Sequence, residues 1–308
     1  MSSAGSQPAG ARASSPSAGE LPADLPPGWR RSARTWILAA RPKTLSASVV
    51  PVLVGTALAH RIDWTIFFCA LFGAVFIQIG TNLVNDALDF KRGADTAERL
   101  GPIRVTQAGL LRANAVLRGA WICFFLAALC GVPLIIRGGW PIVIIGVASI
   151  FAAYAYTGGP YPLGYHGLGE IFVLIFFGVV AVGGSYYVQR LAIDLRALIA
   201  GVAVGLLAVA LLAINNLRDI DSDRGSQKRT LIVRFGERFG RFEIAACVVL
   251  AFVLIAFINL VPLAALPLAA LLIRCLWRSR RAELNRCLAM AGALQWAFGI
   301  LFVLGSLL

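Results

Sequence analysis

Long apolar runs separated by short polar segments make up most of this chain. From about residue 44 to the last residue there are nine such runs, each near the roughly 20 residues that a helix needs to cross the hydrocarbon core of a bilayer. They centre on residues 44–60, 65–84, 114–136, 140–156, 168–188, 195–216, 244–260, 262–277 and 288–308. Backbone N–H and C=O groups in lipid must be satisfied within their own segment, so these runs predict helices rather than strands. The pattern predicts an all-α membrane protein, a bundle of nine transmembrane helices.

The composition agrees with a membrane protein. Hydrophobic residues make up 59% of the 308 positions and charged residues only 14%, and the apolar share exceeds the usual one in soluble domains. Residues 1–28 are rich in Ser, Ala, Gly and Pro and lack the apolar run of a signal peptide, so they predict a disordered cytoplasmic tail. Residues 29–308 are expected to form a single transmembrane domain.

The positive charges sort to one side of the predicted helices. The net charge is +13, and 24 of the 28 Lys and Arg residues fall in the N-terminal tail and the alternate connections, or just beside them. The other four are Arg61, Arg137, Arg190 and Arg196. This bias predicts that the N-terminus and its side of the bundle are cytoplasmic. It also explains the basicity without a nucleic-acid partner.

Acidic residues gather in two short segments on that same side. Seven of the 15 Asp and Glu residues lie within 86–98 and 219–223. In the first segment, the spacing i, i+3, i+4, i+7 places Asn82, Asn85, Asp86 and Asp89 on one helical face. A glycine at position 93 then ends the helix and lets Asp95 fold back toward that face.

The second acidic segment ends the sixth apolar run. Asn216, Asp219 and Asp223 share a face there, whereas Asp221 points roughly the opposite way. Two oxygen-rich faces at one membrane surface suit a hard cation such as Mg²⁺, which completes its shell with water and substrate phosphate oxygens. The expected metal ligands are Asn85, Asp86, Asp89, Asp95, Asn216, Asp219 and Asp223, with Asp86, Asp89, Asp219 and Asp223 expected to be catalytic.

Basic residues interleave with both acidic sets. The side chains expected to bind a diphosphate are Lys91, Arg92, Arg104, Arg218, Lys228 and Arg229. The alternative is that acids and bases at these helix ends form only a solvated face. Carboxylates stacked on one face repel each other unless a cation relieves them, which favours the metal site. Two similar motifs about 130 residues apart also suggest an internal repeat, spans 1–4 against spans 5–8.

Three further elements are candidates for an acceptor or prenyl pocket. Arg41 and Lys43 open the first span, where a snorkelling anchor is the alternative to phosphate binding. Tyr154 and Tyr161 belong to a loop dense in aromatic residues, which is either an interfacial belt or a set of ring faces for a carbocation or an aromatic acceptor. Asn82 completes the candidate pocket.

Five motifs in this sequence are similar to those of a known family. They are Arg41-Pro-Lys-Thr-Leu45, Asn82-Leu-Val-Asn-Asp-Ala-Leu-Asp-Phe-Lys-Arg-Gly-Ala-Asp95, Gly101-Pro-Ile-Arg-Val-Thr-Gln107, Tyr156-Thr-Gly-Gly-Pro-Tyr-Pro-Leu-Gly164 and Asn216-Leu-Arg-Asp-Ile-Asp-Ser-Asp223. From about residue 36 to 308 the chain resembles the UbiA-type intramembrane aromatic prenyltransferases. One departure from the family motif NDxxDxxxD places a glycine at position 93, where the last Asp is expected, and moves the acid to Asp95.

The resemblance implies a fold and a reaction. The fold is a nine-helix bundle whose central cavity is capped by two cytoplasmic acidic loops and opens sideways to lipid. The reaction is Mg²⁺-dependent transfer of a chain from a polyprenyl diphosphate, and the loops typical of the naphthoate branch imply 1,4-dihydroxy-2-naphthoate as acceptor, with decarboxylation, in menaquinone biosynthesis. No obligate protein partner is expected. The alternatives are another aromatic acceptor (a hydroxybenzoate, homogentisate or haem) and, in a different class, a membrane transporter.

Overall fold

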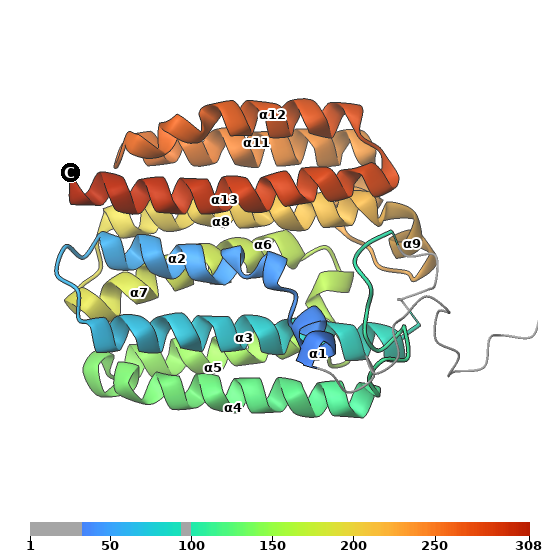
Figure 1. The fold of residues 1–308 in the computed structure, drawn as a ribbon, viewed down its shortest axis with the longest axis horizontal. Coiled ribbons are helices and arrows are strands. Elements are labelled where there is room, and N and C mark those ends of the chain that lie inside the picture. Colours follow the sequence, from blue (N-terminus) through green and yellow to red (C-terminus); the bar gives the residue numbers. More distant parts are fainter. Residues whose placement is uncertain (1–32, 94–99) are drawn as a thin grey trace, which may run out of the picture.

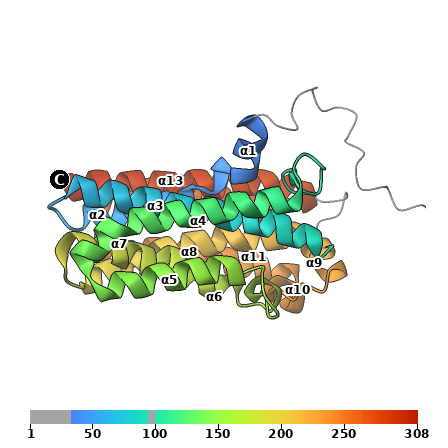
Figure 2. The same cartoon turned by 90° about the horizontal axis from the view of Figure 1, so that it is seen from below.

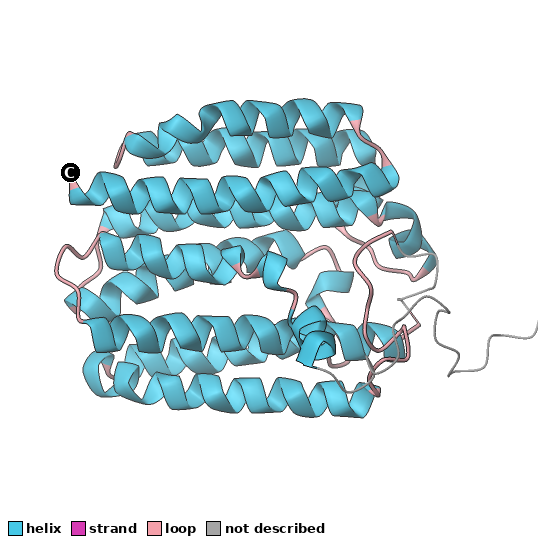
Figure 3. Cartoon of the chain, in the orientation of Figure 1, coloured by secondary structure: helices cyan, strands magenta, loops and turns pink. Residues whose placement is uncertain are grey.

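The computed structural model describes residues 33–93 and 100–308, and within them every regular element is a helix (Figures 1 and 3). The predicted tail 1–28 and Asp95 lie outside the described residues. The α-helices are α1 (Ala33–Ala40), α2 (Ser46–Ala57), α3 (Trp64–Lys91), α4 (Ala113–Gly138), α5 (Trp140–Ala155), α6 (Gly169–Val173), α7 (Ala181–Arg190), α8 (Leu195–Arg218), α9 (Ile220–Gly225), α10 (Leu231–Phe235), α11 (Glu237–Ala256), α12 (Leu266–Arg278) and α13 (Leu284–Leu307). Short tight turns η2 (Pro42–Thr44), η3 (Leu163–Tyr165), η5 (Val261–Ala265) and η6 (Arg281–Glu283) connect them, and a π-helical segment η4 (Leu174–Val180) joins α6 to α7.

The long helices run along one common direction and form a bundle (Figure 2). Within the described residues, seven helical stretches are long and apolar enough to cross a membrane, at Trp64–Lys91, Ala113–Gly138, Gly169–Arg190, Leu195–Arg218, Glu237–Ala256, Val261–Arg278 and Arg281–Leu307. An eighth is formed if the bent pair Ala33–Thr44 and Ser46–Ala57 counts as one span. The prediction of multiple membrane helices is confirmed, and the count by this criterion is seven or eight.

Two of the nine predicted spans are shorter than their apolar runs. Of the first run, 44–60, helix α2 covers only Ser46–Ala57, and it lies at 54° to the preceding helical stretch Ala33–Thr44, in which Arg41 adopts a left-handed backbone with φ of 54°. The fourth run is α5, which has only 16 residues. A glycine at position 139, with φ of 68°, allows the abrupt reversal between α4 and α5 and so sets where α5 begins.

Helix α8 is the most buried of the seven candidate spans, because 72% of its most apolar stretch is buried inside the bundle. Its residues Ala203, Leu207 and Ile214 belong to the larger hydrophobic core, together with Phe252 of α11 and Phe298 of α13. A smaller core cluster lies between α3 and α4. The outer faces of the bundle keep large apolar side chains exposed, which is the pattern of a surface that faces lipid.

The described residues of both acidic segments lie at the same end of the bundle, near α9 in Figure 1. Helix α3 ends at Lys91, and a glycine at position 93 with φ of 70° follows, as the sequence predicted. Helix α8 ends at Arg218, with Asp219 as its C-cap, and α9 begins at the next residue. The fold therefore brings the ends of two long helices, far apart in sequence, to one end of the molecule.

Candidate functional site

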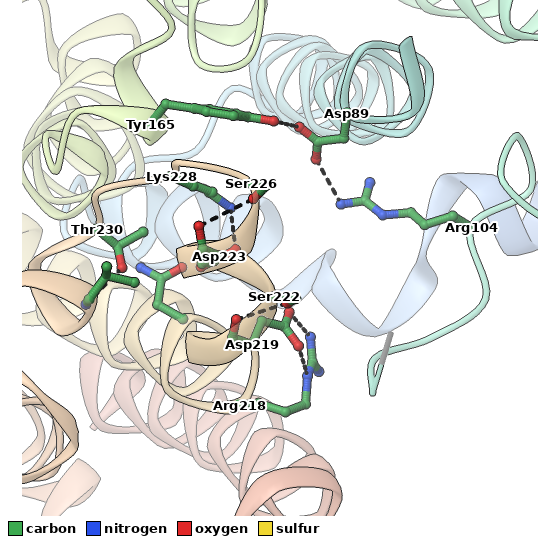
Figure 4. A network of polar contacts seen from close by, with 12 residues as sticks. Asp89, Arg104, Tyr165, Arg218, Asp219, Ser222, Asp223, Ser226, Lys228 and Thr230 are labelled. Carbon is green, nitrogen blue, oxygen red and sulfur yellow. Dashed lines mark hydrogen bonds and ion pairs between the residues drawn. The ribbon is translucent and has the colours of Figure 1, made fainter. Parts of the chain in front are cut away.

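Asp89 lies in the last turn and a half of α3 and is almost fully buried. Its Oδ2 accepts a hydrogen bond from Nη2 of Arg104 at 3.1 Å, and the two side chains form a buried ion pair. Its Oδ1 accepts from the Tyr165 hydroxyl at 2.8 Å (Figure 4). A buried carboxylate must be paired and hydrogen-bonded, and both requirements are met here by side chains that come from two loops.

The other three polar residues on this face of α3 each contact a different segment. Asp86 is 1% exposed and accepts the backbone N–H groups of Val105 and Thr106 at 3.1 and 2.9 Å. Asn85 accepts a hydrogen bond from the Thr157 hydroxyl. Asn82 donates to the backbone carbonyl of Ala40 and to the Thr44 hydroxyl, at 2.9 and 3.0 Å. One helical face thus anchors three connections of the chain around it.

In the second acidic segment, too, carboxylates are paired with basic side chains. Arg218 is 2% exposed and donates from Nε and Nη2 to the two oxygens of Asp219, at 2.8 and 2.7 Å. Asp223 is buried, and its Oδ1 lies 3.6 Å from Nζ of Lys228. Asp221 is exposed and pairs with Arg281, so it points away from the other two acids, as the spacing predicted.

Tyr165 connects the two segments (Figure 4). Its hydroxyl donates to Asp89, while Nζ of Lys228, which pairs with Asp223, lies 5.7 Å from the centre of its ring. Its backbone carbonyl accepts from the N–H of Arg229 at 2.8 Å. The loop that carries Tyr165 therefore holds both acidic segments at once.

A half-buried tyrosine lies among the carboxylates of this region. Burial raises the pKa of Tyr156, and the negative charges of Glu170, Asp89 and Asp223 raise it further, so the phenol stays protonated. Glu170, at the start of α6, is itself buried and accepts from Nδ2 of Asn216 at 3.0 Å. The structure brings acids from three helices within electrostatic range of one neutral side chain.

The donor set suits a hard divalent cation that also takes substrate oxygens. Among the described residues, no three His, Cys, Asp or Glu side chains converge closely enough to hold a metal ion by themselves. Mg²⁺ usually takes one or two carboxylates and fills its other positions with water and phosphate oxygens. Asp89, Asp219 and Asp223, all oxygen donors with cations beside them, fit such a shared site rather than a site made by protein alone.

Several predicted residues lie at the edge of this network. Lys91 donates to the Asn114 side chain at 3.1 Å, and Arg92 donates to the Gly159 carbonyl at 2.6 Å, with its guanidinium 5.4 Å from the centre of the Tyr165 ring. Arg229 is exposed, and its backbone joins Tyr165. Both Lys91 and Arg92 are exposed too, so they form the rim of the site.

The pocket candidates are more scattered. Tyr154 stacks on Trp121 at 5.8 Å, and Tyr161 is 58% exposed and stacks on the ring of His166 at 3.6 Å. Neither has a described hydrogen bond to an acidic residue. Arg41 forms the bend before α2, and Lys43 is exposed at that bend.

Sequence reasoning missed the side chains from other elements that contact, or lie close to, the polar residues of the two acidic segments. They are Tyr156, Thr157, Tyr165, Glu170 and Asn285. Tyr156 and Tyr165 lie in the aromatic loop, where the sequence pattern indicated Tyr154 and Tyr161 instead. These contacts depend on the three-dimensional path of the loops, because the sequence around a loop hydroxyl does not indicate which helix end it will reach.

Three comparisons with known proteins bear on this site. Residues 48–306 match the model of the UbiA prenyltransferase family. The chain is 40% identical over 226 residues to 1,4-dihydroxy-2-naphthoate octaprenyltransferase of Escherichia coli (strain K12), covering 70% of this chain and 73% of that protein. It is 40% identical over 205 residues to the protein of the same name from Mycobacterium tuberculosis (strain ATCC 25618 / H37Rv), covering 66% and 70%. Its fold is similar to that of a UbiA homolog from Archaeoglobus fulgidus bound to DMAPP and Mg²⁺, with a TM-score of 0.61, 13% identity, and coverage of 87% of this chain and 99% of that one.

Proposed function

Because the chain belongs to the UbiA prenyltransferase family, we propose that it transfers a polyprenyl chain from a polyprenyl diphosphate to 1,4-dihydroxy-2-naphthoate, with loss of CO₂. The names of the relatives that are 40% identical to it support this acceptor over a hydroxybenzoate, homogentisate or haem. The observation that carries the proposal is the convergence of two acidic segments, each with its own cations, around Tyr165. A diphosphate carries enough negative charge to engage both sets of cations and, through metal ions, both sets of acids.

The acids of the two segments would hold Mg²⁺ together with the diphosphate. On the α3 side the candidate ligands are Asp89 and Asn85, and on the α8 side they are Asn216, Asp219 and Asp223. Of the other two predicted ligands, Asp86 already accepts backbone N–H groups with both of its oxygens, and Asp95 lies outside the described residues. When bound, Mg²⁺ supplies positive charge that makes diphosphate a better leaving group. The family likeness to a structure bound to DMAPP and Mg²⁺ supports this cofactor.

The cations beside these acids have a second role in the proposal. Arg104 and Lys228 are each within ion-pair distance of a carboxylate, at 3.1 and 3.6 Å. If the carboxylates were to hold metal ions, these cations would be placed to donate hydrogen bonds to phosphate oxygens. Charge-assisted bonds of this kind stabilise the charge that grows on the leaving group.

The reaction needs no covalent intermediate with the protein. The bond between C1 of the prenyl chain and the diphosphate oxygen breaks, and its electron pair leaves with the diphosphate. The ring carbon that bears the carboxylate then forms a bond to the allylic cation. The bond to the carboxylate breaks, its electrons restore the aromatic ring, and CO₂ departs. In this proposal the bundle would shield the cation from water, and Tyr156, held neutral by its raised pKa, contributes no competing phenolate.

The proposal extends to how the protein sits in the membrane. The bent pair at Ala33–Thr44 and Ser46–Ala57 and the short helix α5 would bring the spans to nine. The excess of Lys and Arg at the end that holds the acidic segments supports a cytoplasmic position for that end. The prenyl chain would enter the bundle from the lipid.

The test is an assay of the purified protein in detergent with a prenyl diphosphate, Mg²⁺ and each candidate aromatic acceptor in turn. We expect a prenylated product and released CO₂ with 1,4-dihydroxy-2-naphthoate, and no product when Mg²⁺ is chelated. Product from a hydroxybenzoate or homogentisate but not from the naphthoate would refute the acceptor. Absence of product from every acceptor would refute the reaction and favour a transporter.

A further inference from the structure

Residues 100–107, here called the strap, cross the end of the bundle beside the first acidic segment. The strap carries Arg104, whose side chain reaches Asp89 at 3.1 Å. Its middle is fixed by Asp86, which accepts the backbone N–H groups of Val105 and Thr106. Both of those residues are buried. Asp86 therefore determines where the strap lies, and the strap determines where the Arg104 guanidinium lies.

The other end of the strap is held by a residue of α13. Nδ2 of Asn285 donates to the backbone carbonyl of Leu100 at 2.9 Å. Its Oδ1 accepts from Nη1 of Arg218 at 2.9 Å. Since a carbonyl can only accept and a guanidinium can only donate, this orientation of the amide is the one that satisfies both partners.

Arg218 carries the connection on to the second acidic segment. Its guanidinium is buried and makes two hydrogen bonds to Asp219, at 2.8 and 2.7 Å. The bond to Asn285 occupies the remaining terminal nitrogen, so the arginine is held from both sides. A continuous chain of contacts thus runs from Asp89 through Arg104 and the strap to Asn285, and from there through Arg218 to Asp219.

We propose that Asn285 is a positioning residue of the diphosphate site, which sets the relative placement of Arg104 and Asp219 by holding the strap and Arg218 together. The inference rests on the proposed function, because it assigns Asn285 to the site that would bind the diphosphate. Asn285 touches neither reacting atoms nor the acids themselves. Its role follows from offering one donor and one acceptor, the only pairing that can join a carbonyl to a guanidinium.

Substitutions at this position separate the two contacts. In Asn285→Ala both are lost. In Asn285→Asp the carboxylate still accepts from Arg218 but places an oxygen against the Leu100 carbonyl, so only the strap is released. In Asn285→Gln both groups remain on a side chain that is one methylene longer. Arg286→Gln, which alters the exposed next residue of α13, is the matched control.

The first readout is hydrogen exchange of the peptide covering residues 100–108 in the full-length protein, with and without Mg²⁺ and inorganic pyrophosphate. In the wild type we expect slow exchange at the Val105 and Thr106 amides and further protection when pyrophosphate binds. Asn285→Ala and Asn285→Asp should both speed this exchange and lose the pyrophosphate effect. Asn285→Gln should retain part of the protection and of the pyrophosphate effect, and Arg286→Gln should match the wild type in both.

The second readout compares the KM for the prenyl diphosphate with the KM for the aromatic acceptor. Asn285→Ala should raise the KM for the prenyl diphosphate about tenfold or more, a size typical for loss of residues that orient a metal or ligand group. The KM for the aromatic acceptor should stay within about twofold of the wild-type value, because the strap and Arg218 face the diphosphate. Asn285→Asp should fall between Asn285→Ala and the wild type.

Two results would overturn the proposal. One is unchanged exchange of residues 100–108 in Asn285→Ala. The other is faster exchange with an unaltered KM for the prenyl diphosphate, which would make Asn285 a purely structural contact. If the wild type prenylates no acceptor, the proposed function fails. Hydrogen exchange of the strap with pyrophosphate still tests whether Asn285 holds the strap at the diphosphate site.

Discussion

Asp89 is a buried acid that is held by side chains from two loops. It pairs with Arg104 and accepts from Tyr165, and all three come from different segments of the chain. Asp89→Ala leaves the buried guanidinium without this partner, which should cost about 3–5 kcal/mol of stability. Turnover should fall by about 100-fold or more, because a preorganised charge at the leaving group is lost.

Thermal unfolding in detergent and the rate of diphosphate release measure the two effects of Asp89→Ala. Asp221→Ala is the control, since Asp221 is an exposed acid at the same end of the bundle, in the second acidic segment, and pairs outward with Arg281. That control should retain nearly full activity. An equal loss in both variants would show that acidity at this end of the bundle, rather than the placement of Asp89, is what matters.

The Tyr165 hydroxyl is the next most informative group. Tyr165→Phe keeps the ring beside Lys228 but removes the hydrogen bond to Asp89. A hydrogen bond to a charged group contributes about 1.5–3 kcal/mol, so kcat/KM should fall about tenfold or more. Tyr161→Phe alters an exposed ring of the same loop and should leave kcat/KM unchanged. The account is wrong on this point if both variants behave alike.

Tyr156 gives a prediction about pH. Its pKa is raised in the folded protein by burial and by nearby carboxylates, so folding favours the protonated phenol. The stability it contributes is fully present below the unfolded-state pKa, about 10, and is lost as the pH rises above that value. Thermal midpoints of the wild type should therefore drop more between pH 9 and 11.5, roughly across that pKa, than those of Tyr156→Phe. A parallel drop in both proteins would contradict the assignment.

At the residue scale the sequence predicted the acids and missed their partners. The spacing of Asn82, Asp86 and Asp89 was enough to place them on one face, because helical periodicity is a local property. It was also enough to point Asp221 away. Tyr165, Glu170 and Asn285 reach the same site from other elements, and such contacts depend on how loops return to the bundle.

The packing of helix α8 against η4 depends on two glycines. A Cβ added to Gly205 would lie 2.9 Å from Cα of Gly178 and 2.9 Å from the backbone oxygen of Leu174. The backbones of α8 and η4 therefore touch. This contact lies on the same helix as Asn216, about three turns before the C-terminal end that Asp219 caps. Gly205→Ala should lower the free energy of unfolding by about 1–3 kcal/mol, which is the usual cost of overpacking.

Thermal unfolding in detergent tests the effect of Gly205→Ala. Gly146→Ala is the control, because nothing lies within 4 Å of a Cβ at that position of α5 and alanine favours a helix. It should be neutral or slightly stabilising. Equal destabilisation by both changes would mean that flexibility, rather than close approach, explains the glycines.

At the element scale, hydrophobic runs predicted most helices because a span is a property of about 20 consecutive residues. The run 168–188 was predicted as one helix, yet it contains the π-helical segment η4, where Gly178 meets α8. The run 44–60 was predicted as one span, yet it begins after a bend of 54°. Both irregularities arise from contacts between helices, which the pattern of apolar residues along a single run does not encode.

The distribution of positive charges predicts an orientation of the whole molecule in the membrane, and that prediction is open to test. Single cysteines introduced at exposed positions at the two ends, Gln227→Cys and Arg61→Cys, report on opposite sides of the bundle. A maleimide that does not cross membranes should label Gln227→Cys only in inside-out vesicles and Arg61→Cys only in right-side-out vesicles. The unsubstituted chain measures labelling of the native cysteines. The reverse pattern would contradict a cytoplasmic acidic end.

The central claim is that both acidic segments act on one prenyl diphosphate with Mg²⁺ and transfer its chain to 1,4-dihydroxy-2-naphthoate. The most direct measurement is the Mg²⁺-dependent formation of decarboxylated, prenylated naphthoate by the wild type, Asp89→Asn, Asp219→Asn and the double variant. The account predicts product from the wild type alone, with the double variant no worse than either single one, because each change disables the same site. Substantial activity in either single variant, or product that forms without Mg²⁺, would contradict it.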